Sequence, residues 1–223
     1  MKHYALIVAG GSGMRMGATV PKQFLLLHDK PILMHTLEQF AQCPSKPQII
    51  LVLPESAFPE WQALLIKYPF DVPHLLVAGG DTRIESVKNG LGAISDTKSV
   101  VAIHDGVRPL IAISTIENSY AVAKEKGSAI TCVTLKDSIR YVDSQGTNAL
   151  DRQYHRLVQT PQTFVTAHIK SAYKKANIGY LTDDASVWEA AGRQVALIEG
   201  SYTNLKITTP EDLVIAEALM GMP

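Results

Sequence analysis

The amino-acid sequence predicts an α/β fold: a Rossmann-like, mostly parallel and twisted sheet flanked by helices, with a projecting β-hairpin arm. Short apolar runs of strand length alternate with segments of helical periodicity, which is typical of right-handed βαβ units. The alternation breaks at residues 136–150, where two short strand patterns flank a polar turn. We therefore expect a single domain over residues 1–223, with an arm within it at residues 136–155.

The elements follow in a regular order. The first strand is expected at residues 4–8, Tyr-Ala-Leu-Ile-Val, whose unbroken apolar character indicates burial on both faces. Further strands are expected at residues 48–53, 75–77, 100–104 and 129–135, separated by helices at residues 32–42, 58–68, 83–94 and 113–126. Strands at residues 195–198 and 204–207 return to the sheet. A last helix begins at Thr209-Pro210-Glu211-Asp212 and runs to about Met220.

The arm is predicted from Ile139-Arg140-Tyr141-Val142 and the turn signal Ser144-Gln145-Gly146. A two-stranded hairpin is only marginally stable alone in water. We therefore expect this hairpin to pack on another subunit.

Composition limits the possible partners. The 21 basic and 21 acidic residues give a formal net charge of zero, so no overall field favours nucleic acid or an anionic membrane. Only Cys43 and Cys132 are present, outside any metal-binding spacing, which indicates a reducing compartment. The seven histidines show no metal spacing either, and no apolar run is long enough to span a bilayer. We expect a soluble, cytoplasmic protein.

The first strand ends in Ala9-Gly10-Gly11-Ser12-Gly13-Met14-Arg15-Met16-Gly17, and Pro21-Lys22-Gln23 follows. Glycines let backbone N–H groups approach an anion closely, while Arg15 offers a planar fork of donors and Lys22 a compact charge. The pattern predicts a site for a polyphosphate. A plain strand-to-helix turn with solvated charges is the alternative.

Two common nucleotide motifs do not match this loop. A P-loop requires Lys-Ser or Lys-Thr after its last glycine, whereas Gly17 is followed by Ala18-Thr19. The dinucleotide fingerprint Gly-x-Gly-x-x-Gly fails because three residues separate Gly13 from Gly17. An NAD-dependent oxidoreductase is therefore disfavoured.

Polar residues follow two other strands. Gly79-Gly80-Asp81-Thr82-Arg83 and His104-Asp105-Gly106-Val107-Arg108-Pro109 each come directly after an expected strand. Because parallel strands end at one edge of a sheet, these two loops and the glycine-rich loop are expected to converge there. Each of these residues also has a purely structural interpretation when it is taken singly. Asp105 could cap a turn or helix, and Arg108 could form a surface ion pair. The Gly-Gly segment and Thr182-Asp183 could each be the capped start of a helix.

In their order, these segments resemble the cytidylyltransferases that join CTP to a polyol phosphate. The resemblance covers nearly the whole chain and rests on seven blocks: residues 9–16, 21–24, 79–83, 104–109, 160–162, 182–186 and 204–208.

The resemblance implies a role for each matching residue. Arg15, Lys22 and Lys206 are the implied catalytic residues, the first two holding the triphosphate and stabilising charge at the α-phosphorus. The implied nucleotide-binding residues are Ala9, Gly10, Gly11, Gly13, Gly80, Asp81, Arg83 and Ser86. The implied residues for the polyol phosphate are Asp105, Arg108, Ser138, Arg152, Thr160 and Thr182. Ser138 and Arg152 would reach the neighbouring subunit's substrate, which implies a homodimer. Magnesium is the implied cofactor, with Asp105 as a direct or indirect partner.

The acceptor is less sharply specified. Asp151-Arg152 and residues 182–186 favour 2-C-methyl-D-erythritol 4-phosphate, the acceptor of isoprenoid precursor synthesis. Four residues depart from the usual pattern: Gly10, Ser138 and the pair Gly106-Val107. The Ala9-Gly10-Gly11 start and Gly106-Val107 are similar to the related enzymes that use ribitol 5-phosphate and make CDP-ribitol. A non-catalytic nucleotide-binding module is a further alternative, because binding and catalysis use the same loop.

Overall fold

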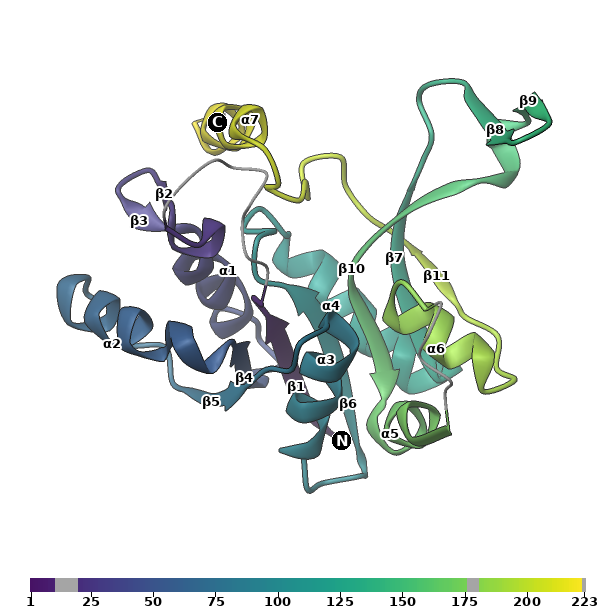
Figure 1. Cartoon of the computed structure of the whole chain (residues 1–223). Coiled ribbons are helices and arrows are strands. Elements are labelled where there is room, and N and C mark those ends of the chain that lie inside the picture. Colours follow the sequence, from purple (N-terminus) through teal and green to yellow (C-terminus); the bar gives the residue numbers. More distant parts are fainter. Residues whose placement is uncertain (11–19, 176–180, 222–223) are drawn as a thin grey trace.

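The structure is a computed structural model, and it describes residues 1–10, 20–175 and 181–221. The fold class is confirmed (Figure 1). A seven-stranded sheet has the order β11-β7-β10-β6-β1-β4-β5. Its strands are β1 (Lys2–Val8), β4 (Gln48–Leu53), β5 (His74–Ala78), β6 (Ser99–Asp105), β7 (Ser128–Thr134), β10 (Arg156–Val165) and β11 (Leu197–Glu199). All neighbours run parallel except β10, which is antiparallel to both β6 and β7.

Helices cover both faces of the sheet, as the buried strands require. One core cluster joins β1 side chains such as Leu6 to α3 (Arg83–Gly92), α5 (Thr166–Lys175) and α6 (Asp184–Ala190). The other joins alternate side chains such as Ile7 to α1 (Ile32–Ala41), α2 (Phe58–Lys67) and α4 (Ile113–Lys126). Successive residues of β1 thus point to opposite helical layers, which explains its unbroken apolar sequence.

The remaining elements lie around this three-layer core. They are η2 (Lys22–Phe24), β2 (Leu26–Leu27), β3 (Lys30–Pro31), η3 (Glu55–Ala57), the arm strands β8 (Ile139–Asp143) and β9 (Gly146–Leu150), η4 (Arg152–Tyr154) and α7 (Pro210–Met220). The arm projects well away from the sheet at the ends of β7 and β10 (Figure 1). Among the described residues, no helix combines the length and the apolar character that crossing a bilayer requires.

Two parts of the predicted order were wrong. The strand expected at residues 204–207 is absent, because Asn204 lies in a turn and the next residues follow no strand ladder. The Ile207 backbone N–H donates to the Val107 carbonyl, which holds this segment over the strand ends. Strand β10 was not predicted, because buried strands were expected from apolar runs. Its buried Gln159-Thr160-Pro161-Gln162 segment is largely polar.

Candidate functional site

The loops after β1, β5 and β6 do converge at one edge of the sheet, as expected. They enclose a cavity of about 240 Å³, here termed the glycine-loop pocket. Its lining residues are Val8, Ala9, Gly10, Lys22, Gln23, Gly80, Asp81, Thr82, Arg83, Ser86, Asp105, Val107 and Lys206. Most of the residues implied for nucleotide binding are therefore brought together.

A second hollow of about 340 Å³, here termed the outer pocket, lies beside the first. It is lined by Arg83, Asp105, Arg108, Val158, Gln159, Thr160, Gln162, Thr182, Asp183 and Lys206. Arg83, Asp105 and Lys206 line both pockets and form what we term the shared wall. Two ligands, one in each pocket, would meet across this wall.

The Asp105 carboxylate is the electrostatic centre of the shared wall. It pairs with Lys206 Nζ at 2.9 Å, Arg83 Nε at 3.4 Å and Arg108 Nε at 3.5 Å. Burial opposes the charge of this carboxylate, but Arg83, Lys206 and Arg108 outweigh burial and hold the pKa of Asp105 well below its ordinary value. The Asp105 carboxylate therefore stays ionised while facing three cations, of which Lys206 and Arg108 have no other carboxylate partner among the described residues, and this arrangement suits phosphate groups.

Arg108 is held from a second side. Its Nη1 donates to the Asn204 carbonyl oxygen at 2.7 Å, and Asn204 Nδ2 donates to the Thr160 carbonyl at 2.8 Å. The Asn204 side chain is fully buried. Asn204 carries no charge and received no role from the sequence. The irregular path of residues 204–208 is what places Asn204 and Lys206 at the site.

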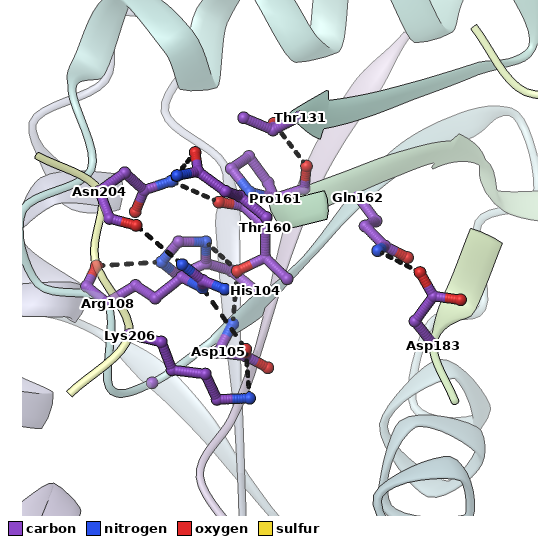
Figure 2. A network of polar contacts seen from close by, with 12 residues as sticks. His104, Asp105, Arg108, Thr131, Thr160, Pro161, Gln162, Asp183, Asn204 and Lys206 are labelled. Carbon is purple, nitrogen blue, oxygen red and sulfur yellow. Dashed lines mark hydrogen bonds and ion pairs between the residues drawn. The ribbon is translucent and has the colours of Figure 1, made fainter. Parts of the chain in front are cut away.

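Behind Asp105 lies a buried hydrogen-bond chain, shown in Figure 2. The Thr160 hydroxyl lies 3.0 Å from His104 Nδ1 and accepts from the Asp105 backbone N–H at 3.1 Å. His104 Nε2 lies 3.2 Å from the Arg108 carbonyl oxygen. Because the Arg108 carbonyl oxygen can only accept, His104 Nε2–H donates to it, and in the neutral ring Nδ1 then accepts from the Thr160 hydroxyl. A neutral His104 thus fixes the loop that carries Asp105 and Arg108.

This buried histidine predicts a stability change with pH. Burial is the main cause that lowers the pKa of His104 from 6.5 to about 4. Below pH 6.5 the unfolded chain takes up a proton that the folded protein refuses until about pH 4, so the free energy of unfolding falls by ~3 kcal/mol across this window. Denaturant titrations at several pH values will measure the slope.

The variant His104→Asn isolates the contribution of this one side chain. Burial also lowers the pKa of His3, His35 and His168, and these residues remain in the variant. We expect a clearly flatter pH profile of stability for His104→Asn. Equal slopes in variant and parent would contradict the neutral, buried state described here.

The Gly79-Gly80 turn and the start of α3 form the far side of the glycine-loop pocket. Ser86 Oγ accepts from the Gly80 backbone N–H at 3.1 Å, and a Cβ added at Gly80 would lie 2.4 Å from Glu85 Cβ. Thr82 and Glu85 form a complete capping box. The capping alternative is therefore real for Thr82, and the same turn presents Gly80, Asp81 and Ser86 to the pocket.

Two glutamines at the site received no role from the sequence. Gln23 is buried, and its Nε2 donates to the Ala9 carbonyl oxygen at 2.8 Å, which ties η2 to the end of β1. Gln162 Nε2 donates to Asp183 Oδ2 at 2.8 Å, and its Oε1 accepts from the Ala185 N–H at the same distance. Figure 2 shows the Gln162–Asp183 contact, which fixes the start of α6. Both glutamines lie in segments that carry the family resemblance, residues 21–24 and 160–162. This position was the sequence signal that could have identified them as site residues.

The remaining expected site residues differ in their outcome. Arg15, Gly11 and Gly13 lie outside the described residues. Thr182 lines the outer pocket. Ser138 and Arg152 lie on the arm, where Arg152 Nη1 donates to the Lys136 carbonyl oxygen, and neither lines the two pockets of its own chain.

The donor set near Asp105 indicates how a divalent cation would be held. In the part of the chain that the structure describes, no three His, Cys, Asp or Glu side chains gather as a metal site. The Asp105 carboxylate already faces three cations. Magnesium commonly binds through phosphate oxygens with few protein ligands. The residues therefore fit a cation that is held mainly by a bound nucleotide.

A mostly parallel sheet with buried cations and two adjoining pockets at its strand ends is typical of a nucleotide-binding α/β enzyme. The family model for 2-C-methyl-D-erythritol 4-phosphate cytidylyltransferase matches residues 3–222. The chain belongs to this family.

Individual relatives agree. The chain is 50% identical over 220 residues to the 2-C-methyl-D-erythritol 4-phosphate cytidylyltransferase of Porphyromonas gingivalis. The aligned residues cover 98% of each chain. It is 44% identical to that of Bacteroides thetaiotaomicron, covering 99% of this chain and all of the relative. The crystal structure of 4-diphosphocytidyl-2C-methyl-D-erythritol synthase from Anaerococcus prevotii superposes with a TM-score of 0.85 at 30% identity, covering 99% of this chain and 96% of that one.

Proposed function

We propose that this protein transfers CMP from CTP to 2-C-methyl-D-erythritol 4-phosphate, giving 4-diphosphocytidyl-2-C-methyl-D-erythritol and pyrophosphate in isoprenoid precursor synthesis. The observation that carries this proposal is the shared wall, because it lets two anionic substrates in adjoining pockets meet at Arg83, Asp105 and Lys206. Family membership identifies the two substrates.

The glycine-loop pocket takes the CTP. Gly80, Asp81 and Ser86 surround the cytosine and ribose, and glycine is needed at position 80 because a Cβ there would lie 2.4 Å from Glu85 Cβ. The backbone of Ala9 and Gly10 follows the triphosphate, and Lys22 neutralises the phosphate charge. We assign Gly11, Gly13 and Arg15 to the same ligand from their places in the sequence motif.

The outer pocket takes the polyol phosphate. Arg108 and Lys206 bind the phosphate, and Thr160 and Thr182 lie where hydroxyl groups of the polyol would be held. Asp105 fixes the two cations and accepts from a polyol hydroxyl group. Lys206 is the more exposed of the cations, which suits a residue that follows the acceptor phosphate toward the α-phosphorus.

The chemistry requires alignment more than proton transfer. The acceptor's phosphate monoester is already anionic near neutral pH, so its oxygen attacks the α-phosphorus without a general base. Attack in line with the leaving pyrophosphate places negative charge on both sides of the α-phosphorus. Lys22 and Lys206 stabilise that charge from fixed positions, and we assign Arg15 the same role from its place in the sequence motif.

We propose magnesium as the cofactor, carried with the triphosphate. When bound, it would neutralise phosphate charge and favour the departure of pyrophosphate. Asp105 is then not a direct ligand of the magnesium ion. It acts on the ion indirectly, by fixing the positions of Arg83 and Lys206.

We further propose a cytoplasmic homodimer of single-domain chains in which the arm, residues 136–155, completes the partner's site. Tyr141 and Val142 are 52% and 67% exposed, a large apolar exposure for a hairpin that is marginal alone. Ser138 and Arg152 are placed on this arm to reach the neighbouring acceptor. Two buried, unpaired cysteines suit the reducing cytoplasm.

The arm predicts a change in oligomeric state. Val142→Asp replaces an exposed apolar side chain of the hairpin with a charge, so we expect a monomer in sedimentation experiments at micromolar concentration and at least a tenfold loss of kcat/KM, because the partner's arm is lost. Ile66→Asp is the matched control, since Ile66 is 89% exposed on α2. A Val142→Asp variant that sediments like the parent would contradict the proposed interface.

Substrate comparison tests the reaction. We expect pyrophosphate release with CTP and magnesium to show a kcat/KM at least a hundredfold higher for 2-C-methyl-D-erythritol 4-phosphate than for ribitol 5-phosphate. Preference for ribitol 5-phosphate would assign the protein to CDP-ribitol synthesis. CTP binding without release with either acceptor would favour the binding module.

A further inference from the structure

A buried polar contact joins three helices behind the shared wall. Asp184, in the first turn of α6, has no exposed surface. Its Oδ2 accepts from Arg83 Nη2 at 2.8 Å, and its Oδ1 accepts from the Tyr173 hydroxyl at 2.5 Å. Arg83 begins α3, Tyr173 belongs to α5, and the surrounding side chains are those of an apolar core cluster.

Asp184 occupies one edge of the Arg83 guanidinium and so determines where the rest of it points. Arg83 Nε lies 3.4 Å from Asp105 Oδ1, within the shared wall. Arg83 Nη1 is buried and has no hydrogen-bond partner among the described residues. Because the guanidinium is planar, fixing Nη2 on Asp184 fixes the directions of Nε and Nη1.

Tyr173 keeps this arrangement in a single protonation state. Burial, and then the neighbouring Asp184, raise the pKa of the Tyr173 phenol well above its ordinary value, so its hydroxyl remains a donor. Burial opposes the charge on Arg83, but Asp184 and Asp105 outweigh burial and raise its pKa. A buried ion pair is seldom more stabilising than an apolar replacement, so stability alone does not explain this carboxylate.

We propose that Asp184, anchored by Tyr173, is a positioning residue that holds Arg83 in the shared wall and thereby keeps Lys206 on Asp105. This inference rests on the proposed function and deepens it. Without the charge of Asp184, the Arg83 guanidinium turns fully to Asp105 and competes with Lys206, which lies 2.9 Å from the same carboxylate. The displacement falls on Lys206, which the proposed function assigns to the acceptor phosphate, while Lys22 on η2 remains in place.

The test is a kinetic split in Asp184→Asn, which keeps the shape of the side chain and removes its charge. We expect kcat to fall about tenfold to a hundredfold, as for a displacement of about 1 Å at a reacting centre, and the KM for the acceptor to rise. The KM for CTP should stay within about threefold. Asp184→Glu restores the charge and should recover a substantial part of kcat.

Two further variants separate positioning from stability. Thr163→Val removes a buried hydrogen bond to Ser119, at 2.8 Å, outside both pockets, so it should lower the Tm without changing kcat. Tyr173→Phe keeps the Arg83–Asp184 pair and should lower kcat severalfold.

Kinetics of Asp184→Asn within threefold of the parent, or an Asp184→Glu variant no better than Asp184→Asn, would overturn the inference. If neither Asp184 variant folds, the Tyr173→Phe variant provides the test. A kcat for Tyr173→Phe equal to that for Thr163→Val would overturn the inference. A parent protein that releases no pyrophosphate from CTP with 2-C-methyl-D-erythritol 4-phosphate contradicts instead the proposed function.

Discussion

Replacement of Lys22 by alanine is expected to lower kcat by about a hundredfold or more. Lys22 is the first residue of η2, is 8% exposed and lines the glycine-loop pocket. A compact ammonium group at this position stabilises the charge that grows on the triphosphate as pyrophosphate leaves. Because this charge is larger in the transition state than in bound CTP, kcat should fall more than the affinity for CTP does.

Steady-state kinetics together with calorimetric titration of CTP will separate these two effects. Lys22→Arg keeps the charge but changes its shape, so it should retain more activity than Lys22→Ala. Lys67→Ala, at the exposed end of α2, is the matched control for loss of a lysine and should leave kcat unchanged. A Lys22→Ala variant with full turnover would remove Lys22 from the catalytic role.

The second large effect is expected at Asp105. Asp105→Asn leaves Arg83, Arg108 and Lys206 crowded together without their common counter-charge. Loss of one partner from a buried ion pair costs roughly 3–5 kcal/mol, so we expect a fall of this order in the free energy of unfolding. Activity should fall as well, because Lys206 and Arg108 lose the carboxylate that orients them toward the acceptor.

An added anion makes this prediction specific to the site. Pyrophosphate should raise the Tm of Asp105→Asn more than that of the parent, because the uncompensated cations attract it more strongly. Asp143→Asn is the control, since Asp143 only caps its own turn on the exposed arm. Equal unfolding free energies for Asp105→Asn and the parent, with equal pyrophosphate effects, would show that Asp105 does not balance the three cations.

The sequence predicted the sheet and the convergence of its loops because both depend on local patterns. Apolar runs such as residues 4–8 report burial directly, and the carboxyl ends of parallel strands must meet at one edge. Asp105 and Gly80 were found for this reason. The resemblance then supplied roles that single residues, such as Thr182, did not specify.

The parts that were missed depend on contacts between distant segments. Arg83 and Asp184 are 101 residues apart, and no local pattern connects them. Gln162 is polar in sequence yet buried, because its amide bonds to the start of α6 satisfy both of its polar atoms. Asn204 was assigned to a strand together with residues 205–207, whereas its side chain donates to the Thr160 carbonyl oxygen on β10.

Transfer across the shared wall is tested most directly by following one reaction mixture of the purified protein, CTP, magnesium and 2-C-methyl-D-erythritol 4-phosphate by phosphorus NMR. We predict equal amounts of pyrophosphate and of a cytidine diphosphate ester whose two phosphorus atoms are coupled, formed at the rate of CTP loss. CTP that persists unchanged, or CMP released without the diester, would contradict transfer across the shared wall.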